Sequence, residues 1–180
     1  MTDFNSRGAG SVATSWWQEL NPPDGLRTGN ERAALAHLRR AGTPLEAVRE
    51  TATLSLIQRL PHYRNKDRIA ALAGVLAWVR ENDDRPVARV IGRGSLDNSD
   101  AVMSEVRFRR LLHAADDGEL MDAMRRLVRL ADRKVNVRDL SNSVLYWGDG
   151  VRKRWIFDYY GVGIATPTAS STAQQGDPAA

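Results

Sequence analysis

The sequence predicts an all-α protein, built of two packed helical lobes that form a compact bundle with a disordered C-terminal tail. Apolar residues recur at spacings of three and four along most of the chain, which is typical of one buried helix face. No segment shows the sustained alternation of apolar and polar residues that a half-buried strand requires. The run "PVARVI" at residues 86–91 could form a strand, but it has no second strand with which to pair.

The N-terminal half contains three predicted helices. The first covers residues 30–41, and the second covers residues 44–60, where Pro44 suits the first turn and Pro61 ends the helix. The third is "DRIAALAGVLAWVREN", which begins at Asp67. Its apolar stripe consists of Ile69, Leu72, Ala73, Leu76 and Val79.

The C-terminal half contains two helices in which arginines alternate with core residues, "SEVRFRRLLHA" from Ser104 and "ELMDAMRRLVRLADRK" from Glu119. Their inward stripes are Phe108, Leu111, Leu112 and Ala115 in the first and Leu120, Met124, Leu127 and Ala131 in the second. Each residue advances about 100° around a helix, so the arginines between these positions are expected to face outward. This applies to Arg109, Arg110, Arg125, Arg126, Arg129 and Arg133, with Arg107 at the boundary.

Composition suggests four regions along the chain. Residues 1–13 and 162–180 are small and polar, so we expect both to be disordered. Residues 83–101 hold proline, glycine, serine, asparagine and aspartate, which favours a junction between lobes near residue 95. The sequence therefore predicts an N-terminal lobe at 14–95 and a C-terminal lobe at 96–161.

The chain is mildly basic, with a formal net charge of +4 and a sequence pI of about 9.8. Nearly all its basic residues are arginines, whose planar guanidinium suits phosphate groups. A GC-rich genome would also raise the arginine content, so the number of arginines alone does not indicate phosphate binding. The sequence has no cysteine and no apolar run long enough for a membrane helix, which predicts a cytoplasmic protein without disulfides or thiolate metal sites.

Motifs for catalysis are lacking, so we expect no enzyme, no metal and no cofactor. His37, His62 and His113 lie far apart without metal-ligand spacing. The Gly-x-Gly of "IGRGSLDNSD" lacks the third glycine and the lysine of a phosphate-binding loop. Asp116 and Asp117 suit a helix start. The five tryptophans, Trp16, Trp17, Trp78, Trp147 and Trp155, suit packing, and one or two could stack on bases of a single strand.

Four segments together resemble the CasB family, the small subunit of the type I-E CRISPR Cascade complex. They are "WWQELNPPDG", "GNERAALAHLRRA", "SEVRFRRLLHAADDGELMDAMRRLVRLA" and "VLYWGDGVRKRWIFDYYG", and the resemblance covers about residues 14–161. The chain departs from the family pattern at Val106, where leucine is more usual. The resemblance implies a non-catalytic helical subunit, present as two copies, whose basic surface steadies the guide RNA–target DNA R-loop and its displaced strand without reading sequence.

The implied partners are the large subunit, the guide-RNA backbone subunits, the repeat-processing subunit, a second copy of the chain, the guide RNA and the target DNA. Carried over by segment, the expected backbone contacts are Arg32, Arg39, Arg40, Arg107, Arg110, Arg125, Arg126, Arg129, Arg152 and Lys153, with Arg27 as an outside candidate. Some of these arginines are expected to hold partner subunits instead.

Two other functions stay open at the level of sequence. The arginine faces could meet acidic partner proteins, which would make the chain a helical adaptor with no nucleic-acid contact. A helical transcriptional regulator is a third alternative, although no tight turn leading into an exposed recognition helix is found.

Overall fold

The computed structural model describes residues 6–22 and 26–162, and most of them are helical, which confirms the all-α prediction. The helices are α1 (Ser6–Leu20), α2 (Gly29–Arg40), α3 (Pro44–Val48), α4 (Thr51–Arg59), α5 (Lys66–Leu76), α6 (Val87–Ile91), α7 (Glu105–Leu112), α8 (Asp117–Leu130), α9 (Val137–Leu145) and α10 (Asp149–Tyr160). Two short strands, β1 (Glu81–Asn82) and β2 (Lys134–Val135), pair in parallel.

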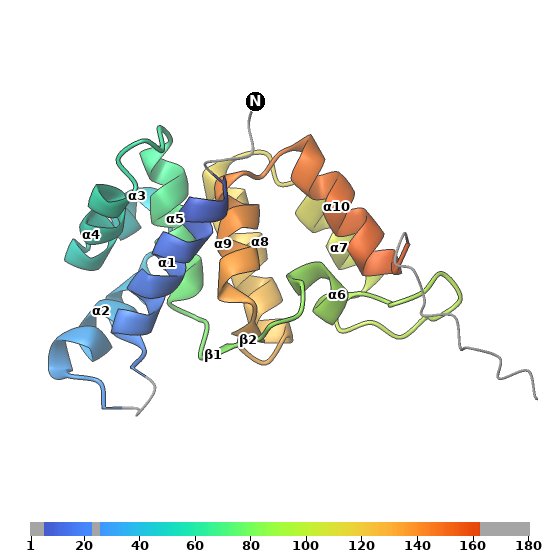
Figure 1. Cartoon of the computed structure of the whole chain (residues 1–180), viewed down its shortest axis with the longest axis horizontal. Helices are drawn as coiled ribbons and strands as arrows, with labels where there is room; N and C mark the ends of the chain where they lie inside the picture. Colours follow the sequence, from blue (N-terminus) through green and yellow to red (C-terminus); the bar gives the residue numbers. More distant parts are fainter. Residues whose placement is uncertain (1–5, 23–25, 163–180) are drawn as a thin grey trace, which may run out of the picture.

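The helices form an elongated arrangement with α8 and α9 in the middle (Figure 1). On one side lie α2, α3, α4 and α5, and on the other lie α6, α7 and α10. Within the N-terminal half α3 packs against α5, and the main pairs between distant parts of the chain are α1 with α9, α5 with α8 and α6 with α10. These pairs cross the predicted lobe junction near residue 95, and the division into two lobes stays a prediction.

Helix α5 is the centre of the N-terminal half. Every residue from Ile69 to Leu76 is buried, and α5 contacts α2, α3, α4, α8 and α9. Its small alanines and Gly74 let neighbouring helices approach closely. The helix ends at Leu76, earlier than predicted, because the chain then pairs with the segment after α8: the Arg80 and Glu81 amides donate to the Arg133 carbonyl at 2.8 and 3.2 Å.

One other sequence prediction for helix extent is wrong. The single helix expected at 44–60 is two helices, because the amides of Arg49 and Glu50 bond to carbonyls three residues back and tighten the chain into a turn before α4 begins. The run at residues 86–91, which the sequence left open as a strand, contains helix α6, and each of the two strands found within residues 6–22 and 26–162 has only two residues.

The expected disorder of residues 1–13 is wrong for residues 6–13, which belong to α1. Ala9, Ala13 and Trp16 of this helix are buried. Gly10 lies so close to α9 that an added Cβ would be 2.5 Å from the Asn142 side-chain oxygen. The close contact with α9 therefore stabilises the start of α1. Residues 1–5 and all of the predicted tail except Val162 lie outside the described residues.

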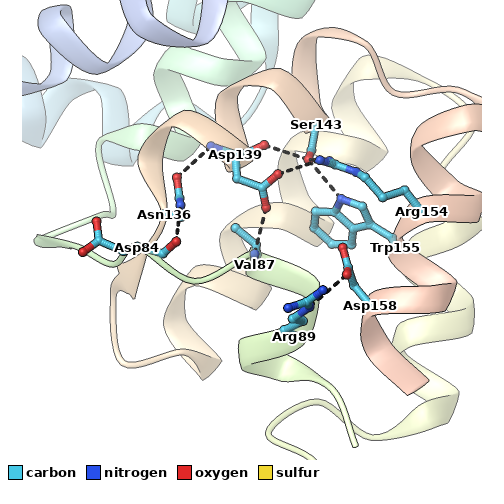
Figure 2. Close-up of polar contacts among 9 residues, drawn as sticks. All are labelled: Asp84, Val87, Arg89, Asn136, Asp139, Ser143, Arg154, Trp155 and Asp158. Atoms are coloured by element: carbon cyan, nitrogen blue, oxygen red, sulfur yellow. Dashed lines mark hydrogen bonds and ion pairs between the residues drawn. The ribbon is translucent and has the colours of Figure 1, made fainter. Parts of the chain in front are cut away.

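A polar network centred on Asp139 of α9 joins α6, α9 and α10 (Figure 2). One carboxylate oxygen of Asp139 accepts from the Val87 amide at 2.8 Å and so caps α6 from a distant part of the chain. The other accepts from Arg154 of α10 at 2.9 Å. Figure 2 also shows Asn136 at the start of α9 donating to the Asp84 carbonyl.

Ser143 is the second centre of this network. Its hydroxyl donates to the Asp139 carbonyl at 2.7 Å and accepts from Arg154 at 2.8 Å and from the Trp155 indole N–H at 3.0 Å. Trp155 is fully buried, so this hydroxyl satisfies an indole N–H that water does not reach.

Replacing Ser143 by alanine should lower the free energy of unfolding by about 1–3 kcal/mol, because it leaves the Trp155 N–H buried without an acceptor. Urea unfolding followed by circular dichroism measures the effect. The control is Ser15→Ala, which removes an exposed hydroxyl that bonds only within its own helix. Equal stability of the two variants would contradict this account of the network.

Candidate nucleic-acid interface

Helices α7 and α8 are positioned by apolar faces and by one clear cap. Phe108 and Leu111 of α7 are buried, and so are Leu120, Met124 and Leu127 of α8, as the sequence predicts. Asp116 caps α8, because its carboxylate accepts from the Glu119 amide at 2.8 Å. The buried faces fix which side of each helix remains open to solvent.

Between α7 and α8 lies a groove of about 480 Å³, which we call the α7–α8 groove. Four arginines line it, Arg107 and Arg110 from α7 and Arg126 and Arg129 from α8. Its remaining lining residues are Met103, Leu111, Ala123 and Leu130. The sequence prediction named all four arginines, and the fold brings them into one depression.

The positive charge of the α7–α8 groove is largely uncompensated. Among the described residues, the one ion pair that a groove arginine makes within 4.0 Å joins Arg126 to Asp122 at 4.0 Å, and both side chains are exposed. Arg107, Arg110 and Arg129 have no carboxylate partner among the described residues. Arg109, by contrast, pairs with Glu105 of its own helix. Four guanidinium groups beside an apolar surface can hold phosphate oxygens and could also contact a sugar or base.

Arg125 is not part of this surface, and its prediction as a backbone contact is wrong. The side chain is buried, with the residue only 7% exposed. Its three nitrogens donate to the carbonyls of Gly74, Ala41 and Leu38 at 3.0, 2.7 and 2.9 Å. Burial lowers the pKa of Arg125, but a guanidinium keeps its charge at neutral pH. Arg125 therefore ties α8 to the ends of α2 and α5.

The candidates in and near α2 lie in different surroundings. Arg39 is half-buried and donates from Nε to the Ala77 carbonyl at 2.7 Å. Burial lowers its pKa, and the charges of Arg27, Arg80 and Arg133 lower it further. Arg27 is half-buried and donates to the Asn21 side-chain oxygen at 2.6 Å. Arg32 and Arg40 are exposed, and the depression beside Arg40 also contains His37, Arg49, Glu46 and Glu50, so its charge is mixed.

The two candidates on α10, Arg152 and Lys153, both contact neighbouring residues of the fold. Arg152 donates to the Ala114 carbonyl at 3.0 Å, and its guanidinium lies 5.7 Å from the Trp147 ring centre. A carboxylate oxygen of the exposed Asp149 is 3.6 Å from an Arg152 nitrogen, so the charge of Arg152 has a partner in its own helix. Lys153 is exposed, with its ammonium 5.8 Å from the Phe157 ring centre.

The sequence did not predict that one group of cations lies close together around Trp78. Arg80 and Arg133 lie near Arg39, and Arg133 lies over the ring of Trp78. Their proximity depends on the β1–β2 pairing, and two-residue strands have no periodicity from which to predict it.

Within residues 6–22 and 26–162, no group of three or more histidine and acidic side chains could hold a metal ion. In the same part of the chain, no helix is long and apolar enough to cross a membrane.

The fold and the groove define a small all-α protein with an arginine-lined surface suited to anions. The family model of the CRISPR-associated protein Cse2 matches residues 34–160, and the chain belongs to this family. Cse2 is another name for CasB, so the resemblance found in the sequence is confirmed.

Comparison with solved structures gives the same fold. A chain in the crystal structure of E. coli Cascade bound to a PAM-containing dsDNA target matches with a TM-score of 0.62 and 16% sequence identity. The match covers 83% of this chain and 95% of the other. A search of curated protein sequences found no match.

Replacing Arg125 by alanine should destabilise the fold by roughly 2–4 kcal/mol, since it removes three buried hydrogen bonds and leaves a cavity between α2, α5 and α8. Arg126→Ala, one position along the same helix, is the matched control and should change stability by less than about 0.5 kcal/mol, because its side chain is exposed. Thermal unfolding measures both. An Arg125→Ala variant as stable as the control would contradict the structural role.

Proposed function

We propose that the chain is a non-catalytic small subunit of a type I-E Cascade complex and that it binds nucleic-acid backbone without sequence specificity. In this role it stabilises the guide RNA–target DNA R-loop, including the displaced strand. Its partners are the large subunit, the guide-RNA backbone subunits, the repeat-processing subunit, a second copy of itself, the guide RNA and the target DNA. A cytoplasmic location is part of the same proposal.

The observation that carries this proposal is the α7–α8 groove. Three of its four arginines lack a carboxylate partner among the described residues, so they are free to neutralise phosphates. Such contacts fix the position of a strand but carry no sequence information. Only four residues, 113–116, join α7 to α8, but the arginines of the groove come from both helices and not from a single recognition helix. Membership of the Cse2 family supports the assignment to Cascade.

One observation favours a role in protein contacts as well. Helix α10 buries Trp155 and Tyr159 yet leaves Ile156 37% and Phe157 45% exposed. Exposed apolar side chains on a helix whose opposite face is buried are typical of a subunit interface. The adaptor function without nucleic-acid contact therefore remains the second candidate.

Replacing Arg107, Arg110 and Arg126 together by glutamine should weaken binding of oligonucleotides of any sequence roughly 10- to 100-fold at low salt. The slope of log affinity against log salt should become shallower by about two to three, because binding releases fewer counterions from the nucleic acid when phosphate contacts are lost. Fluorescence anisotropy over a salt series measures both quantities.

The matched control replaces Arg49, Arg64 and Arg138 by glutamine. These exposed arginines lie outside the α7–α8 groove, and the variant loses the same three charges. It should keep most of the affinity. If the two triple variants bind equally, the groove is not the binding site. If both variants and the wild-type chain fail to bind while the chain still assembles with its partners, the adaptor function replaces this proposal.

A further inference from the structure

A second cluster of cations surrounds Trp78 beyond the end of α5. Arg129 and Arg133 lie over its indole ring, with guanidinium carbons 5.2 and 5.5 Å from the ring centre. The Arg80 amide donates to the Arg133 carbonyl at 2.8 Å, which brings these two residues together. Arg39 donates to the carbonyl of Ala77, the neighbour of Trp78. We call Trp78, Arg39, Arg80, Arg129 and Arg133 the Trp78 cluster.

The charges of the Trp78 cluster are not balanced. Across residues 6–22 and 26–162, none of its four arginines has a carboxylate oxygen within 4.0 Å. Glu81, which is close in sequence, instead pairs with Lys134 at 3.3 Å. Burial lowers the pKa of Arg39, and the like charges of Arg27, Arg80 and Arg133 lower it further. Like charges held together without an acid favour the binding of an anion.

The backbone at Arg133 points to the same conclusion. Asp132 and Arg133 have φ angles of 52° and 61°, in the left-handed region that glycine adopts most easily. This turn links α8 to β2, and the Arg133 amide donates to the Val128 carbonyl at 2.8 Å. Glycine would fit such a helix end better. The chain has an arginine there instead, and its side chain reaches Trp78. A side chain kept at a strained position indicates a use for that side chain.

The Trp78 cluster shares a residue with the α7–α8 groove. Arg129 lines the groove and also lies over Trp78. The two surfaces therefore meet at one guanidinium, and a phosphate chain bound in the groove could continue toward Arg133 and Arg80.

We propose that the Trp78 cluster is a second phosphate-binding site, which takes the phosphodiester backbone of the same nucleic-acid strand that the α7–α8 groove binds. Arg39, Arg80 and Arg133 neutralise its phosphates, Trp78 holds Arg129 and Arg133 in place, and Arg129 joins the two sites. This inference rests on the proposed function, since it extends the binding surface described there.

Two glycine variants test the site. Arg133→Gly and Asp132→Gly each place glycine in a left-handed position, so each relieves the same kind of backbone strain. Arg133→Gly should weaken binding of a fluorescein-labelled oligothymidylate about fivefold and make the salt slope shallower by about one. Asp132→Gly should leave affinity unchanged or raise it, because it removes a negative charge. Equal affinity and equal salt slope for the two variants would overturn the proposal.

Arg133→Gly removes the contact of Arg133 with Trp78 and could lower the melting temperature for that reason alone. Arg80→Gln is therefore a second test that leaves this contact in place. The Arg80 side chain is exposed, and the backbone bond to Arg133 does not involve it. This variant should keep the wild-type melting temperature and still weaken binding about threefold to fivefold. Wild-type affinity of Arg80→Gln, with an intact fold, would overturn the second site.

The same measurements separate the two proposals. If the wild-type chain does not bind, the proposed function fails, and if the triple groove variant keeps full affinity, the groove is not the binding site. If the triple groove variant weakens binding while Arg133→Gly and Arg80→Gln do not, only the second site fails.

Discussion

The arrangement of α2, α5 and α8 depends on one buried guanidinium, that of Arg125. Its donors meet carbonyls of Leu38 and Ala41 at the end of α2 and of Gly74 in α5. Carbonyls at the end of a helix lack partners within it and carry partial negative charge, so a cation there satisfies both needs. Gly74 makes the approach possible, since an added Cβ would be 2.7 Å from an Arg125 nitrogen. Arginine side chains usually lie in solvent, but the buried side chain of Arg125 joins three helices of the core.

The burial of Arg125 also determines which residues of α8 face the solvent. Adjacent residues on a helix differ by about 100°, so Arg126 turns toward the α7–α8 groove while Arg125 points into the core. Arg129, one turn along, lies both in the groove and over Trp78. One helix therefore uses neighbouring arginines for stability and for the proposed contact with phosphate.

The sequence predicts the strongly periodic parts of this fold and not the parts decided by distant contacts. The seam of Leu120, Met124 and Leu127 follows from helical spacing, and so does the outward direction of Arg126. Arg125 lies one turn from Met121 and from Val128, both fully buried, so helical spacing places it at the edge of the buried face. Its partner Gly74, however, lies far away in the chain, and periodicity does not predict that contact. Helix α6 was missed for a similar reason, because its cap is the side chain of Asp139 in α9.

Arginine footprinting of the assembled complex tests the central claim most directly. Modification by phenylglyoxal, followed by mass spectrometry, reports which guanidinium groups are accessible before and after a target DNA binds. We predict that Arg107, Arg110 and Arg126 are modified in the complex without DNA and protected in the DNA-bound complex, while Arg125 stays unmodified in both states. Arg125 modified in the folded chain, or groove arginines that react equally with and without DNA, would contradict the account.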